Sequence, residues 1–132
     1  MDLALIAAVL LAVAALLQVG LALGAPWGSI AYGGRMANPN GTLPTRLRLM
    51  SAVAAAVLLL ATYVVLARGG LIGSGWSQDF LTWATWVIAG LMVLNTIGNL
   101  ASSNPIERFV LGSMTVAVAA LAGLVALRGP DL

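Results

Sequence analysis

Three amide side chains lie inside otherwise apolar stretches of the sequence and are the first candidates for chemistry. Gln18 lies in the stretch 3–24, and Asn95 and Asn99 lie in the stretch 80–100. At the rise of a helix, Gln18 and Asn95 would lie at similar depths, about 9 to 10 Å from the same end of the bundle. An amide in hydrocarbon is costly unless it is hydrogen-bonded, so these groups should point inward. They would either join helices to one another or form the polar floor of a ligand pocket.

Tryptophans suggest a second element of such a pocket. Trp76, Trp83 and Trp86 have the spacing of one helical face. The simpler interpretation is an aromatic belt at the membrane interface. The alternative is a tryptophan-lined groove, and we therefore include Trp83 and Trp86 with the three amides as predicted ligand-binding residues.

Missing residue types exclude most other chemistry. The chain has no His and no Cys, and its six basic residues are all arginine. Serine and threonine therefore lack a His or Lys to activate them, and the usual ligands for structural zinc are absent. Asp79 and Glu107 are expected at opposite membrane faces, so they cannot act as a carboxylate pair. We predict no catalytic residues, no metal, no cofactor and no nucleic-acid binding.

The elements that must position the amides are apolar helices. The chain of 132 residues is 61% hydrophobic and only 8% charged, which is far from the composition of a soluble domain. Four apolar runs are each close to the ~20 residues that span a bilayer. They cover residues 3–24, 47–67, 80–100 and 106–127. The sequence predicts an all-α integral membrane protein with a single domain over residues 1–132.

Local signals mark where these helices begin. Asn104 is predicted to cap the fourth helix, with Pro105 in its first turn and Glu107 as the acid of a capping box. Ser77 or Asp79 should cap the third helix.

Ionisable residues are absent from the middle of every span, which argues against a pump or proton relay.

Arginine counts predict the topology. Arg35, Arg46, Arg48 and Arg108 fall at one end of the predicted bundle, and two arginines fall at the other. The positive-inside rule then places both termini outside and the loops 25–46 and 101–105 in the cytoplasm.

The long first connection is rich in Gly, Pro and Asn, which favour turns. Trp27 and Tyr32 predict that it lies against the lipid headgroups, and Arg46 and Arg48 are predicted to contact anionic headgroups. Whether residues 25–43 re-enter the membrane or lie flat on it stays open.

Small residues predict close helix packing. Gly20 with Gly24, and Ala119 with Gly123, have the four-residue spacing of helix-packing surfaces. The two predicted hairpins also share an amide, a proline turn, an arginine and an early serine, which is compatible with a parallel internal repeat.

Two motifs carry a resemblance. Gly24-Ala25-Pro26-Trp27-Gly28 and Leu43-Pro44-Thr45-Arg46-Leu47-Arg48 resemble those of short, uncharacterised four-span membrane proteins from GC-rich actinobacteria. The resemblance implies a four-helix fold in a bacterial plasma membrane, and it implies no activity.

Two hypotheses for the function of this chain remain. The first prediction is a non-catalytic accessory subunit or homo-oligomer, whose partners would be the bilayer and another protein or a second copy. The alternative is a binder or carrier of a lipid or hydrophobic small molecule in an intramembrane pocket over Gln18, Asn95 and Asn99. Charge-free spans also permit a small pore but do not suggest one.

Overall fold

The chain folds into four long helices joined into two hairpins. The computed structural model describes residues 2–131. The helices are α1 (Leu3–Ala22), α2 (Thr45–Arg68), α3 (Gln78–Leu100) and a fourth that begins as a π-helical turn, η3 (Ile106–Leu111), and continues as α4 (Gly112–Arg128). Each of the four is long and apolar enough to cross a membrane, so the predicted fold class is confirmed.

The helix ends follow their capping residues. Asp2 accepts hydrogen bonds from the N–H groups of Ala4 and Leu5, and Ser77 accepts one from Phe80. Asn104 Oδ1 accepts from the N–H of Ile106 at 2.8 Å, which opens the fourth helix as predicted.

Glu107 differs from its predicted place in a capping box. Its carboxylate accepts a hydrogen bond from the distant Gly33 N–H, 74 positions earlier in the chain, at 3.0 Å. The cause lies in the backbone around it. Glu107 is in the π-helical turn η3, where the Gly112 N–H bonds to the Glu107 carbonyl five residues back. Its side chain therefore projects toward the first hairpin.

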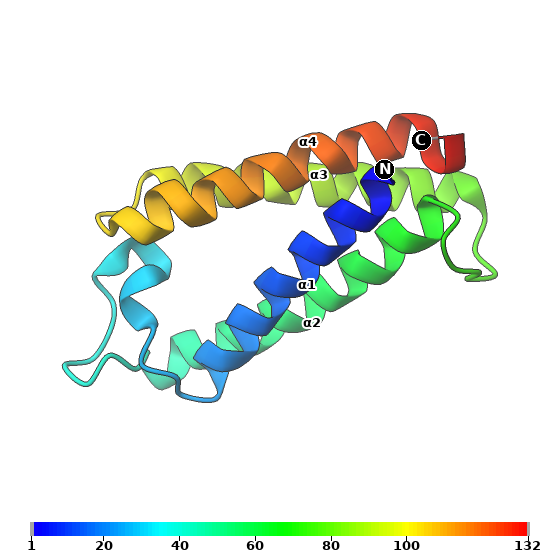
Figure 1. Ribbon diagram of the computed structural model, residues 1–132. Helices are drawn as coiled ribbons and strands as arrows, with labels where there is room; N and C mark the ends of the chain where they lie inside the picture. Colours follow the sequence, from blue (N-terminus) through cyan, green and yellow to red (C-terminus); the bar gives the residue numbers. More distant parts are fainter. Residues whose placement is uncertain (1, 132) are drawn as a thin grey trace.

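The two hairpins pack closely at one end of the bundle and diverge toward the other (Figure 1). The end with both termini and the α2–α3 connection is called the terminal end, and the end with residues 23–44 and 101–105 is called the loop end. The main core joins all four helices with residues such as Leu11, Val65, Leu81 and Val125, all in the half toward the terminal end. Toward the loop end, α3 and α4 contribute no member to the second core cluster, which consists of Leu21, Ala31, Leu43 and Leu47.

The long first connection fills part of the space between the diverging hairpins. It contains two short 3₁₀ turns, η1 (Gly28–Ile30) and η2 (Tyr32–Gly34), whereas the second hairpin closes in a short turn over residues 101–105. Gly33 fastens the loop to that turn, because its carbonyl accepts from both the N–H and the Oγ of Ser103, at 3.1 and 2.9 Å.

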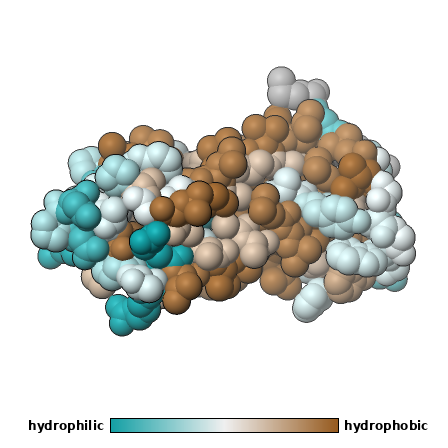
Figure 2. Space-filling view, turned by 90° about the horizontal axis from the view of Figure 1, so that it is seen from below, coloured by the Kyte–Doolittle hydropathy of each residue, from teal (hydrophilic) through white to brown (hydrophobic). Residues whose placement is uncertain are grey.

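Hydrophobic side chains cover the middle of the bundle, and hydrophilic ones gather toward its ends (Figure 2). The exposed apolar residues include Leu16, Leu60, Leu94 and Val116, one from each helix. Such a band is the surface that a bilayer covers, so the chain is a multi-pass membrane protein in contact with lipid.

Candidate functional site

A cavity of about 510 Å³ opens where the hairpins diverge, at the loop end. Its volume is in the range of sites that hold drug-sized ligands. Most of its lining is apolar, from Leu17, Leu21, Met92, Leu111 and Met114. The polar lining consists of side chains from α1, α3, the loop and the fourth helix, namely Gln18, Tyr32, Asn95, Asn99, Glu107 and Thr115.

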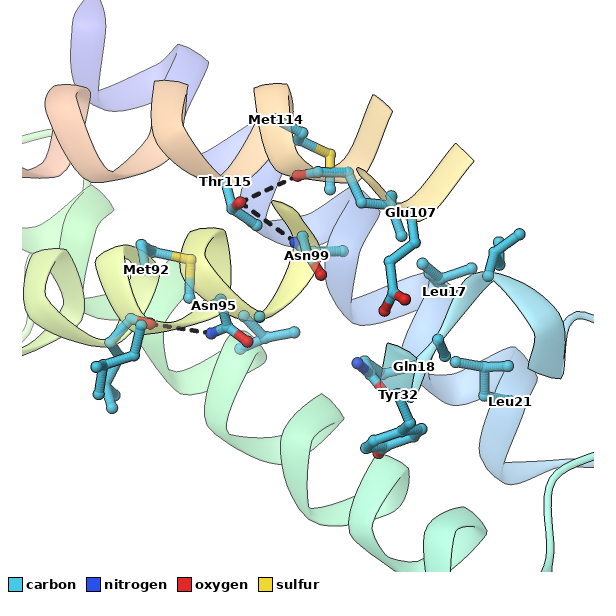
Figure 3. Close-up of a pocket in the computed structure, with 18 of the residues that line it drawn as sticks. Leu17, Gln18, Leu21, Tyr32, Met92, Asn95, Asn99, Glu107, Met114 and Thr115 are labelled. Carbon is cyan, nitrogen blue, oxygen red and sulfur yellow. Dashed lines mark hydrogen bonds between the residues drawn. The ribbon is translucent and has the colours of Figure 1, made fainter. Parts of the chain in front are cut away.

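All three amides predicted from the sequence line this one cavity, from two different hairpins (Figure 3). They do not satisfy one another. Asn95 Nδ2 donates to the Leu91 carbonyl of its own helix at 3.1 Å, and Asn99 Nδ2 donates to Thr115 Oγ1 at 3.3 Å. Gln18 Oε1 is buried and has no hydrogen-bond partner. An unpaired buried amide oxygen costs roughly 1 to 3 kcal/mol, which is the kind of cost that a ligand donor removes.

Thr115 fixes the orientation of the Asn99 amide. Its hydroxyl donates to the carbonyl of Leu111 at 3.0 Å, so its oxygen can only accept from other side chains. It accepts from Thr96 Oγ1 at 2.9 Å and from Asn99 Nδ2. One of the two N–H groups of Asn99 is therefore used within the protein, and its oxygen is left for the cavity (Figure 3).

Tyr32 forms part of the cavity wall from the loop. Its φ of 51° is in the left-handed region, which costs a non-glycine residue on the order of 1 to 2 kcal/mol. The hydroxyl is held by Ser51 Oγ at 2.9 Å. Gly33 and Gly34 follow with φ of 88° and 84°, and this run of positive φ turns the Gly33 N–H toward Glu107. Strain of this kind is concentrated at functional sites.

Glu107 is the one charged residue among the described lining residues, and sequence reasoning missed it. It is only 5% exposed, and its carboxylate faces the space shared with Gln18 and Asn99 (Figure 3). The sequence places it at a helix start beside Arg108, which is the normal setting of an exposed capping acid. Its proximity to Gly33 depends on a long-range contact that no local pattern indicates.

The mouth of the cavity lies on the side of α3 that faces outward. Leu91, Leu94, Asn95 and Gly98 line the cavity and are also exposed, and they repeat at helical spacing along one side of α3. Since Leu91 and Leu94 are exposed apolar residues of a helix that is long and apolar enough to span a membrane, the opening meets lipid.

Trp83 and Trp86 do not line this cavity. Trp83 borders a smaller groove of about 240 Å³ between α2 and α3, with Trp76 and Phe80. Trp86 lies beside Gly123 of α4. Both tryptophans are in the half of α3 toward the terminal end, whereas Asn95 and Asn99 are in the other half, so the structure separates residues that we had grouped.

The residues predicted at the headgroups have more varied surroundings. Arg46 is exposed in the first turn of α2. Arg48 Nε donates to the Ala22 carbonyl at 3.0 Å, so it caps the end of α1. Tyr32 is turned toward Ser51, as described above, and Trp27 is about half exposed at 45%.

The small residues at the end of α1 face other parts of the same chain, since Gly20 meets the loop residue Trp27, and Gly24, just after the helix, meets Arg48 of α2. A Cβ placed on Gly20 would lie 2.2 Å from the Trp27 ring, and one on Gly24 would lie 3.2 Å from the Arg48 guanidinium. Gly24 has a φ of 96° and turns the chain after α1. On α4, Ala119 packs against the main core, and a Cβ on Gly123 would make an ordinary 3.7 Å contact with Trp86.

Comparisons with family models, with curated proteins and with solved structures find no match for this chain. Within residues 2–131, the structure also brings together no group of three acidic side chains that could hold a metal ion. The candidate site is therefore defined by its own geometry, as an apolar cavity with hydrogen-bonding groups at the loop end.

Proposed function

We propose that this chain binds a lipid-like or amphipathic small molecule in the cavity between its two hairpins, as a non-catalytic binder or carrier. The observation that carries the proposal is a mainly apolar cavity of about 510 Å³ whose polar lining includes three amides that do not bond to one another. Polar atoms without partners beside apolar lining suit a molecule that has both a polar head and an apolar body.

The assembly hypothesis has less support from the geometry. One of its grounds was the small-residue surface of Gly20 and Gly24, and both glycines are covered within the chain by Trp27 and Arg48. A pocket closed by amides bonded only to one another would have argued against ligand binding. The amides instead bond to a carbonyl and a threonine, or have no partner.

The proposal keeps the chain in a bacterial plasma membrane with both termini outside. Arg35, Arg46, Arg48 and Arg108 belong to the loop end, whereas Arg68 and Arg128 end α2 and α4 at the terminal end. This distribution supports a cytoplasmic loop end. The cavity would then receive its ligand from the inner leaflet.

Two glycines of α3 provide a matched test. A Cβ on Gly98 or on Gly90 meets nothing within 4 Å, and both residues are exposed. Gly98 lines the cavity, whereas Gly90 does not. Gly98→Leu should therefore obstruct the mouth without disturbing the fold, and Gly90→Leu adds the same side chain elsewhere on the helix.

The measurement is native mass spectrometry of each variant released from its own membranes in mild detergent. We expect wild type and Gly90→Leu to retain a small added mass and Gly98→Leu to lose it. Equal retention by both variants would contradict binding in this cavity. Whole multiples of the chain mass, or the mass of another polypeptide, would favour the subunit hypothesis instead.

A further inference from the structure

Glu107 is a buried carboxylate for which the chain supplies a neutral donor but no cation at the cavity. Its Oε1 accepts the Gly33 N–H at 3.0 Å. Of the described residues that line the cavity, Glu107 alone carries a charged side chain. A carboxylate removed from water is strongly disfavoured unless an opposite charge and further hydrogen bonds compensate it. The Gly33 N–H is neutral, so it provides a hydrogen bond to Glu107 but no opposite charge.

Two arginines at the loop end, Arg108 and Arg48, have partners other than Glu107. Arg108 directs its Nε to the Leu100 carbonyl at 2.9 Å, and its guanidinium lies 5.8 Å from the centre of the Phe109 ring. Arg48 donates to the end of α1. Arg35, two residues after Gly33, is exposed, and no arginine is among the described residues that line the cavity, so a ligand would supply the cation that completes the Glu107 site.

The neighbouring amides present acceptors to the same space. Asn95 and Asn99 each donate one of their two N–H groups, to Leu91 and to Thr115, so each amide has its oxygen and one N–H left over. The oxygen of Gln18 has no partner either. Each unpartnered oxygen has two lone pairs, so acceptor positions outnumber the free amide N–H groups around Glu107, and an ammonium group, with three donors and no acceptor, matches such a set.

The remaining lining fits a single apolar chain. Leu17, Leu21, Met92 and Met114 surround the polar groups, and methionine adapts to chains of varied shape. A volume of about 510 Å³ suits one small amphiphile. A phospholipid would bring its phosphate, and the described lining residues include no cation to receive it.

From these observations we infer that the ligand class is a cationic amphiphile, an alkyl chain with a protonated amine that pairs with Glu107. This inference rests on the proposed function and specifies the head group that the same cavity selects. The amine would lie between Glu107 and the oxygens of Asn95 and Asn99, with its tail along Leu17 and Met92.

The experiment compares two probes of equal length, dodecylamine and dodecanol. Binding of each labelled probe is measured by scintillation proximity in phosphatidylcholine nanodiscs, and the signal of empty nanodiscs is subtracted. We expect wild type to bind the amine at least about tenfold more tightly than the alcohol, since a hydrogen bond to a charged group is stronger than a neutral one.

Three variants test whether Glu107 is responsible for the preference for the amine over the alcohol. Glu107→Gln retains an oxygen for the Gly33 N–H and should weaken amine binding about tenfold while it leaves the alcohol unchanged. Asp79→Asn removes a carboxylate at the terminal end of α3 and should change neither probe. Asn95→Asp, at the exposed mouth, adds a carboxylate and should strengthen amine binding, which keeps the test valid if Glu107→Gln fails to fold.

The outcomes separate the two proposals. Equal binding of amine and alcohol, unaffected by Glu107→Gln, would overturn the cationic class and leave a pocket for neutral amphiphiles. Absence of binding by both probes would overturn the pocket function together with this inference. Replacing phosphatidylcholine with phosphatidylethanolamine identifies the source of the amine. If phosphatidylethanolamine displaces dodecylamine, the natural amine belongs to a membrane lipid. We expect no displacement, which would assign the amine to a free amphiphile.

Discussion

Substitution of Gly20 by alanine tests whether the first loop is seated as described. The Cβ of an alanine at this position would lie 2.2 Å from the Trp27 ring, whereas ordinary contacts begin at 3.4 Å. The ring must therefore move by at least 1.2 Å, the difference of those two distances. Since Trp27 belongs to the loop that bears Tyr32 and Gly33, this movement loosens one wall of the cavity.

The expected magnitude follows from two opposing effects. Alanine is favoured over glycine in a helix by about 1 kcal/mol, and overpacking typically costs about 1 to 3 kcal/mol. Gly20→Ala should then change the free energy of unfolding by between about zero and 2 kcal/mol in the destabilising direction. Gly90→Ala, whose Cβ meets nothing within 4 Å, should gain the full ~1 kcal/mol.

Reversible unfolding in mixed detergent micelles, followed by circular dichroism, provides the free energies. The decisive control repeats both Gly20→Ala and Gly90→Ala in a Trp27→Ala background. There the two substitutions should change the free energy of unfolding by amounts that agree to within about 0.5 kcal/mol. If Gly20→Ala stabilises the protein as much as Gly90→Ala does while Trp27 is present, then Trp27 does not lie on Gly20, and the described loop position is wrong.

Three further substitutions test individual contacts of the site. Thr115→Val should lower the free energy of unfolding by about 1 kcal/mol, which is the scale of hydrogen bonds between membrane helices. Asn99→Leu should then cost less in the Thr115→Val variant than in wild type. Tyr32→Phe removes the bond to Ser51 and should cost about 1 kcal/mol and speed proteolysis of the loop by trypsin. Arg48→Met removes the donor to the last carbonyl of α1 and should speed amide hydrogen exchange there, and unchanged exchange would contradict the cap.

The helices could be predicted because lipid imposes a strict length and composition on each span. Predicted and observed ends agree to within about two residues, as usual for helix boundaries. Caps such as Ser77 and Asn104 were readable since each bonds within three residues of itself. Information of this kind is local, and the sequence contains it directly.

The site was predicted in part. The sequence alone identified Gln18, Asn95 and Asn99, because a polar amide within an apolar span stands out whatever the fold. Trp83 was grouped with them, and the structure places it at a different groove, twelve residues of helix from Asn95, or about 18 Å along the axis. That distance was available from the sequence and excludes a shared small pocket.

Glu107 could not have been found in the same way. Its direction depends on the π-helical turn η3, and its contact is with Gly33, 74 positions away. A π turn has no reliable sequence signal, and glycine-rich loops such as residues 25–43 adopt the path that their tertiary contacts select. The lining contributed by the loop was therefore beyond prediction for a physical reason.

The position of the cavity mouth determines how affinity must be measured. Because Leu91, Leu94 and Gly98 border an opening toward lipid, a ligand arrives from the bilayer at its membrane concentration. Each added methylene favours partitioning by about 0.8 kcal/mol, which enriches an amphiphile about fourfold in the membrane. The apparent dissociation constant in water would then fall about fourfold per methylene, even for carbons that never touch the protein. Affinities for ligands of different length can be compared only when the ligand concentration is expressed as mole fraction in lipid. A modest intrinsic affinity would suffice to keep the site occupied by a molecule that is scarce in the surrounding water.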